Sequence, residues 1–325
     1  MHFSQFDHAT VPAGTKQTMY LDIAPLSGGE MLRLAVLVAR GAKPGPTIAI
    51  TGGVHGDEYE GPHAVREVFA SLDPAEMSGT FMGISQTNVP AFTAGTRNSG
   101  IDGGNLARVF PGKPNGNVTE RIAYHVGSRF IGRSDFYIDL HSSGSHIAMP
   151  TLIGYCATPD DRGRRSKEAA LAFGVPVIWG HPAVAPGRTI SFADERGIPW
   201  LYSECPGGGW LHQEIAATYA QGVRNVMMVL GILPGKPTVT PPKYRLIGDG
   251  NIDVAPSVSA GGYLVPEVDI LQRVKKGDVL GRVVGLGGEL LEELRTTVSG
   301  VVVLVRRTPS VQPGEQAFLV TQEEN

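Results

Sequence analysis

The stretch Thr51-Gly-Gly-Val-His-Gly-Asp-Glu-Tyr-Glu-Gly61 decides how this chain is organised. It follows the apolar run Thr47-Ile-Ala-Ile50, which predicts a buried strand that ends in a glycine-rich turn. Open α/β sheets bind their ligands at that end of the strands. His55 and Glu58 lie three residues apart, and on a tight turn this spacing puts both side chains on one side of the backbone. Both are ligand types that suit Zn²⁺, but an isolated His-x-x-Glu match is also typical of a surface ion pair.

The composition indicates a globular protein that acts on a small molecule. Its 325 residues, 42% of them hydrophobic, are enough for a large α/β domain and a smaller module. A net charge of -3 with only 18% charged residues gives no indication of a nucleic-acid partner. Because the sequence shows no signal-peptide pattern, no membrane-spanning run and only two cysteines, Cys156 and Cys205, we expect a cytoplasmic protein without contact to a membrane. A bridge between the two cysteines and a homo-oligomeric assembly are both left open.

Strand and helix signals alternate from residue 17 to residue 230, which predicts an α/β fold with a mixed, mostly parallel sheet flanked by helices. Residues 17–40 contain two strand signals and are expected to form an antiparallel edge of the sheet. A glycine-rich loop at 91–116 is too long for a simple connector, so we expect it to carry function. Further strands are predicted at 47–51, 79–85, 135–141, 175–179 and 199–204, and helices at 61–72, 118–130, 159–173, 190–196 and 212–230.

A proline-rich run separates this part of the chain from a C-terminal part of different character. Gly235-Lys-Pro-Thr-Val-Thr-Pro-Pro-Lys243 is typical of a linker, and short β-branched runs between glycines follow it. We therefore predict a main domain at 1–235 that holds the site, a linker at 236–243, and a small all-β domain at 244–325.

A third candidate metal ligand, His141, ends the predicted strand at 135–141. A single histidine in this position more often caps a strand by hydrogen bonding. Parallel strands that end at the same edge can, however, bring His55, Glu58 and His141 together with a fourth position left for water, which is the composition of a catalytic zinc site. Asp139 is the type of carboxylate that orients a ligating imidazole, although a role in strand-end hydrogen bonding would explain it equally well.

Glu204 and three residues of the long loop are candidates for catalysis and substrate binding. Glu204 ends the apolar strand at 199–204, where partial desolvation would raise its pKa towards that of a useful general base. A salt bridge to an arginine is the alternative for this carboxylate. Arg97, Asn105 and Arg108 supply donors that suit carboxylate recognition or oxyanion stabilisation, and the alternative for each is a solvated loop side chain.

Four linked motifs resemble the succinylglutamate desuccinylase and aspartoacylase family, whose fold is zinc carboxypeptidase-like. They are His55-Gly-Asp-Glu58, Arg97-x-x-x-x-Asp102-Gly-x-Asn105-Leu-x-Arg108-Val-Phe-Pro-Gly112, Asp139-Leu-His141 and Glu204-x-x-Gly-Gly208, and they cover about residues 45–230. Members of this family hydrolyse the amide bond of N-acyl amino acids. The resemblance implies one Zn²⁺ per chain on His55, Glu58 and His141, Glu204 as general base and then acid, Arg97 polarising the scissile carbonyl, and Asn105 and Arg108 at the substrate end.

Two positions depart from the family pattern. Ala107 stands where the family commonly has Asn, so an amide donor for the substrate carboxylate is missing, and Gly100 stands where a proline is common. Arg188, upstream of Glu204, is a candidate replacement cation. The leading prediction is a zinc-dependent hydrolase of N-acyl amino acids, for which N-acetyl-diaminobutyrate is one specific substrate option. A carboxypeptidase acting on short peptides and a metal-bound binding protein without turnover are the alternatives.

The C-terminal part is similar to the β-sandwich of biotinyl and lipoyl carriers in Val274-Lys-Lys-Gly-Asp-Val-Leu-Gly281 and Val298-Ser-Gly-Val-Val302. A carrier needs a lysine in the hairpin between these motifs, and Glu289-Leu-Leu-Glu-Glu-Leu-Arg295 contains none. We therefore predict no covalent cofactor, and we expect this module to cover the rim of the active site or to form an oligomer contact.

Overall fold

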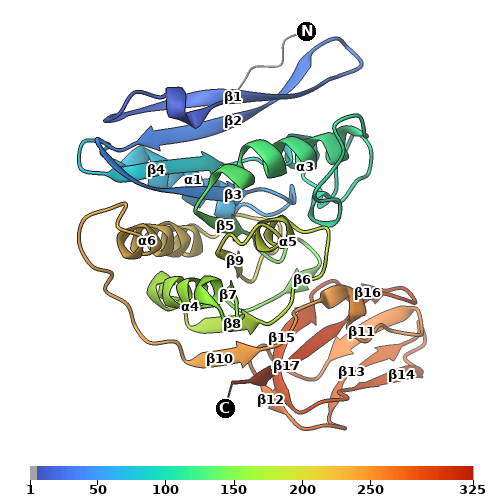
Figure 1. The fold of residues 1–325 in the computed structure, drawn as a ribbon. Coiled ribbons are helices and arrows are strands. Elements are labelled where there is room, and N and C mark those ends of the chain that lie inside the picture. Colours follow the sequence, from blue (N-terminus) through green and yellow to red (C-terminus); the bar gives the residue numbers. More distant parts are fainter. Residues whose placement is uncertain (1–5, 325) are drawn as a thin grey trace.

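A 13-stranded mixed sheet forms the centre of the protein (Figure 1). A four-stranded antiparallel sheet lies beside the edge of this sheet that the C-terminal strands form. The computed structural model describes residues 6–324; residues 1–5, which belong to the stretch searched for a signal peptide, lie outside it. The fold class predicted from the sequence is confirmed. None of the described helices has the length and apolar character needed to cross a membrane.

The predicted antiparallel edge is formed by β1 (Thr15–Pro25) and β2 (Met31–Arg40), and β2 also pairs with β4 (Ser78–Ile84). Leu32, Leu34, Val36 and Val38 are buried along β2, while the residues between them are more exposed. This alternation arises because successive side chains of a strand point to opposite faces of the sheet.

Three parallel strands at the centre of the sheet position the candidate site. They are β3 (Lys43–Gly52), β5 (Phe136–Leu140) and β9 (Trp200–Glu204), which lie side by side in that order, so that their C-terminal ends meet at one edge. Beyond them, β7 (Leu152–Cys156) runs antiparallel to β9 and parallel to β8 (Val177–His181).

Helices cover both faces of these strands (Figure 1). On one face α1 (Glu60–Ser71), α4 (Asp161–Phe173) and α6 (Gln213–Val229) share a core with Ile48, Ile50 and Leu201. On the other face α3 (Val118–Arg129) and α5 (Thr189–Asp194) share a second core with Ala49 and Trp200. The strands are therefore apolar on both sides, which explains why the sequence shows them as continuous apolar runs.

The C-terminal strands continue the central sheet beyond the proline-rich run. β10 (Tyr244–Ile247) pairs with β8 and with β17 (Phe318–Glu323), and β17 pairs with β15 (Gly300–Arg306), which also contacts β6 (Ile147–Ala148) and β12 (Arg273–Val274). The second sheet comprises β14 (Leu290–Arg295), β13 (Val279–Val284), β11 (Gly262–Pro266) and β16 (Ser310–Val311). Val283 and Leu264 from this sheet pack against Val302 and Phe318 of the first, so the module has a two-layer core of its own.

Candidate metal centre and active site

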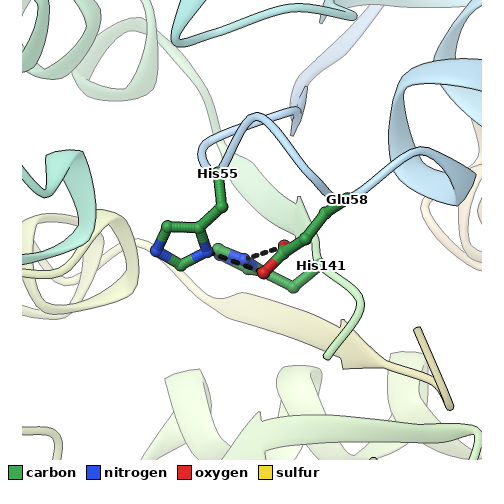
Figure 2. A group of neighbouring side chains, drawn as sticks. All are labelled: His55, Glu58 and His141. Atoms are coloured by element: carbon green, nitrogen blue, oxygen red, sulfur yellow. Dashed lines mark hydrogen bonds and ion pairs between the residues drawn. The ribbon is translucent and has the colours of Figure 1, made fainter. Parts of the chain in front are cut away.

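Three side chains with metal-binding groups converge where β3 and β5 end (Figure 2). One potential ligand atom from each of His55, Glu58 and His141 lies within 4.8 Å of the other two. His55 Nδ1 is 2.8 Å from Glu58 Oε1, and His141 Nδ1 is 2.9 Å from Glu58 Oε2. His55 and Glu58 come from the turn between β3 and α1, and His141 follows β5 directly, so the pairing of the two strands brings the three residues together.

Both imidazoles turn the same nitrogen towards the carboxylate, because the other nitrogen has its own partner. His141 Nε2 donates to Asp139 Oδ2 at 2.9 Å, and His55 Nε2 donates to Asn105 Oδ1 at 3.2 Å. These oxygens accept hydrogen bonds, so each Nε2 carries a proton and each Nδ1 is the nitrogen available to a metal. Two imidazole nitrogens and a carboxylate directed at one point are a donor set that fits Zn²⁺.

The electrostatics of the cluster also favour a cation. Desolvation acts to lower the pKa of His141, but the charges and hydrogen bonds of Asp139 and Glu58 raise it well above its usual value. Desolvation likewise acts to raise the pKa of Glu58, yet the two histidines hold it far below the ordinary range. The carboxylates therefore stabilise positive charge between the three side chains, whether it is a proton or a metal ion.

Asp139, which holds His141, is fixed by hydroxyl groups. Thr51 Oγ1 donates to Asp139 Oδ1 at 2.7 Å, and Thr189 Oγ1 donates to Asp139 Oδ2. Asp139 is almost fully buried, so these bonds compensate for the lost hydration of its carboxylate. Of the two readings that the sequence left open, the contact with His141 Nε2 favours an orienting role in the candidate metal site.

Glu204 stands at the end of β9, beside the cluster. Burial, together with the negative charge of Glu58, raises its pKa to about 8, while the positive charges of His141 and Arg97 act in the opposite direction. Its Oε2 is buried and has no hydrogen-bond partner among the described residues. A buried carboxyl group with a raised pKa and a free oxygen is suited to accept and return a proton.

Two short elements that the sequence did not predict lie in or next to the long loop at 91–116. They are α2 (Val89–Ala94), which overlaps the start of the loop, and a 3₁₀ turn at Leu106–Arg108. Asn105 caps this turn through its Oδ1, which accepts from Ala107 N at 3.0 Å. The same oxygen accepts from His55, so the amide NH₂ is the part of Asn105 left for a substrate. Arg97 Nη1 lies 3.4 Å from Glu58 Oε1, which places this guanidinium next to the metal cluster.

A cavity of about 120 Å³ brings most of the predicted residues together. His55, His141, Glu204, Arg97, Arg108 and Arg188 line it. Glu58 does not line the cavity itself but contacts both of the histidines that do. Asn105 lines an adjoining pocket of about 240 Å³. The roles of Glu204 and of the loop residues stay predictions.

The sequence analysis missed the part of the cavity wall that is formed by β8, β9 and the C-terminal strands. His181, Tyr202, Asp249, Ile252 and Leu319 all line the cavity. Tyr202 lies in the predicted strand at 199–204, two residues before Glu204, and could have been found from that position. No sequence signal shows that residues 249–252, in the C-terminal part of the chain, lie at the site.

Comparisons with known proteins show the family to which this chain belongs. Residues 44–230 match the family model of the succinylglutamate desuccinylase/aspartoacylase catalytic domain, and the chain belongs to that family. The resemblance predicted from the four motifs is therefore confirmed.

Three similar proteins match this chain over most of their own length. N-alpha-acetyl-L-2,4-diaminobutyric acid deacetylase of Halomonas elongata is 32% identical over 300 residues, which are 90% of this chain and 86% of that protein. The product-bound structure of the ectoine utilization protein EutE (DoeB) from Ruegeria pomeroyi has a TM-score of 0.87 at 28% identity and covers 96% of this chain and 98% of its own. The crystal structure of a succinylglutamate desuccinylase from Silicibacter sp. TM1040 has a TM-score of 0.86 at 28% identity, and the match covers 97% of this chain and 98% of that one.

Proposed function

We propose that the protein hydrolyses the amide bond of N-acyl amino acids with one Zn²⁺ held by His55, Glu58 and His141. The observation that carries this proposal is the convergence of the three side chains beside a buried carboxyl group, Glu204, in one cavity. A zinc ion bound there would supply a Lewis acid and lower the pKa of a water ligand. Family membership supports the reaction class.

Glu204 moves the proton that the hydrolysis requires. Its carboxylate accepts a proton from the attacking water as the water oxygen bonds to the acyl carbon. The same carboxyl group then returns the proton to the amide nitrogen as the C–N bond breaks, which releases a carboxylate and an amine. The pKa of about 8 fits both tasks, because the group is a stronger base than an ordinary glutamate and still a usable acid. Arg97 stabilises the negative charge that develops on the carbonyl oxygen.

The substrate class follows from the charges on the cavity wall. Arg108 and Arg188 offer two guanidinium groups for the carboxylate of an amino acid. Among the described residues, three carboxyl groups line the cavity. Asp139 is bonded to His141 and to two hydroxyls, Glu204 carries the proton, and Asp249 remains for a cationic group of the substrate. We therefore propose a short N-acetyl amino acid with an amino group on its side chain, the class named for the relative from Halomonas elongata.

Zinc analysis and a substrate panel test the proposal. The zinc-loaded protein is incubated with N-acetyl-2,4-diaminobutyrate, other N-acetyl and N-succinyl amino acids, and dipeptides, and amine release is measured. We expect hydrolysis of the N-acetyl-diaminobutyrate to be fastest and hydrolysis of dipeptides to be negligible. If the zinc-replete protein releases no amine from any acyl amino acid, the deacylase proposal fails; if dipeptides are the best substrates, the carboxypeptidase alternative replaces it.

A further inference from the structure

The segment at 248–253 follows β10 and runs into the 3₁₀ turn at Ile252–Val254. It contributes Asp249, Gly250 and Ile252 to the wall of the cavity that holds the site. His181 Nδ1 donates to Gly248 O at 2.7 Å, which ties the start of the segment to β8. Gly250 has a φ of +63°, and a Cβ at this position would lie 2.5 Å from His181 Cε1. Only glycine therefore allows the backbone to approach the cavity wall this closely.

Asp253, at the end of this segment, bridges two of the arginines that line the cavity, Arg108 and Arg188. Its Oδ1 accepts from Arg108 Nη2 at 2.8 Å, and its Oδ2 accepts from Arg188 Nη2 at 3.1 Å. Asn251 supports the arrangement, because its Oδ1 accepts from Arg188 Nη2 at 2.8 Å and from Asp253 N at 3.2 Å. Residues from three distant parts of the chain thus meet at one carboxylate.

The two guanidinium groups need an anion between them. Desolvation and the charge of Arg108 lower the pKa of Arg188, which shows that each cation is unfavourable to the other. Desolvation acts to raise the pKa of Asp253, but both arginines lower it, so its carboxylate stays charged and offsets the repulsion. The loops that carry the arginines are also linked directly, since Phe110 N donates to Gly187 O at 3.1 Å.

Both arginines can still donate to a ligand. The side chains of Arg108 and Arg188 are 28% and 16% exposed, and both line the cavity. A guanidinium has five N–H groups in a fixed plane, so one that is held on one side by a carboxylate presents the remaining groups in a defined direction.

We propose that Asp253 is a positioning residue, supplied by the C-terminal part of the chain, that holds Arg108 and Arg188 in place for the carboxylate of the substrate. The inference rests on the proposed deacylase function. It gives the C-terminal part a role in substrate binding in addition to covering the cavity. Asp253 itself does not touch the substrate; its effect on binding is exerted through the two arginines.

The test compares Asp253→Asn with wild type on two substrates, an N-acetyl amino acid that wild type hydrolyses and its carboxamide. Loss of a charge-assisted hydrogen bond at a partly exposed site is expected to lower kcat/KM for the carboxylate substrate by roughly 10-fold, mainly through KM. The carboxamide, which has no charge for the arginines to bind, is expected to react equally well with both proteins. Asp253→Glu is expected to restore part of the loss.

The matched control is Glu323→Gln, which breaks the ion pair of Arg273 and Glu323 in the same part of the chain, away from the cavity. It is expected to leave both substrates unaffected. Three results for Asp253→Asn would each overturn the inference. They are an equal loss of kcat/KM on the carboxylate and the carboxamide, an unchanged KM, and a lower KM, which is expected if Asp253 competes with the substrate. Calorimetry of the amino-acid product gives a second readout, with weaker binding expected for Asp253→Asn. An inactive wild-type protein would refute the proposed function instead.

Discussion

Replacing Glu204 by glutamine separates the chemical role of this residue from its effect on stability. Glutamine keeps the shape of the side chain but cannot take up a proton at neutral pH. General acid–base catalysis contributes about 10²- to 10⁴-fold to rates. Because Glu204 is proposed to act twice, first as base and then as acid, we expect kcat to fall by about 10³- to 10⁴-fold, or about 4 to 5 kcal/mol in the barrier. The zinc content of the variant should equal that of the wild type, since Glu204 is not among the proposed ligands.

The same substitution should stabilise the metal-free protein. The pKa of Glu204 is raised to about 8 in the folded state, so the unfolded state ionises at a lower pH than the folded state does. The stability of the wild type therefore falls as pH rises from about 4.5 to 8, by roughly 2 kcal/mol after allowance for partial exposure of the side chain. Glu204→Gln removes this loss, and it breaks no hydrogen bond to Oε2, which has no partner among the described residues.

Two assays check this prediction. Amine release by the zinc-loaded proteins measures the catalytic loss, and urea unfolding of the chelator-treated proteins at pH 5 and pH 8 measures the stability difference. The variant should be clearly more stable than wild type at pH 8 and similar to it at pH 5. Wild-type turnover with full zinc content would refute the role of Glu204 in proton transfer. A variant that is no more stable at pH 8 would show that the carboxyl group is not destabilised by burial.

Four further predictions concern the substrate, the pH dependence of stability, the metal and the packing at the site. Asp249→Asn should lower kcat/KM for N-acetyl-diaminobutyrate by roughly 10-fold and leave N-acetyl-aminobutyrate unchanged; an equal loss on both would contradict the proposed contact. Burial lowers the pKa of His181 to about 4, so the metal-free protein should lose roughly 3 kcal/mol of stability from this group as pH falls from 6.5 to 4. Urea unfolding of His181→Asn should show a smaller loss of stability over the same pH range. Chelation should abolish amine release and added Zn²⁺ should restore it, whereas His141→Ala should retain almost no zinc by metal analysis. Gly61→Ala would place a Cβ 2.3 Å from Leu140 O, so denaturant unfolding should show a loss of about 2 kcal/mol in the free energy of unfolding. The affinity for zinc should also fall. An unchanged unfolding midpoint would mean that the backbone relaxes there without cost.

The sequence determined the elements of the central sheet and the positions of its polar strand ends. Apolar runs with turn signals gave β3, β5 and β9 within a residue or a few residues of their bounds, because the helices that cover both faces demand such runs. The short helix α2 was missed because its six residues are too few to show a helical period, although Asn88 caps it and Pro90 lies in its first turn. His55, Glu58, His141 and Glu204 were found because each follows or ends an apolar strand.

Only the tertiary structure decided which of these strands lie side by side and what holds each polar group. The partners of the two imidazoles, Asn105 and Asp139, follow from side-chain directions that the sequence does not give. The contact between Arg108 and Asp253 joins residues 145 positions apart, and it exists because β10 pairs with β8 and returns the C-terminal part to the cavity. The hydrophobic periodicity of a segment indicates which of its side chains are buried. Which distant segments pair depends on the free energy of the whole packed chain, so no single stretch of residues determines it.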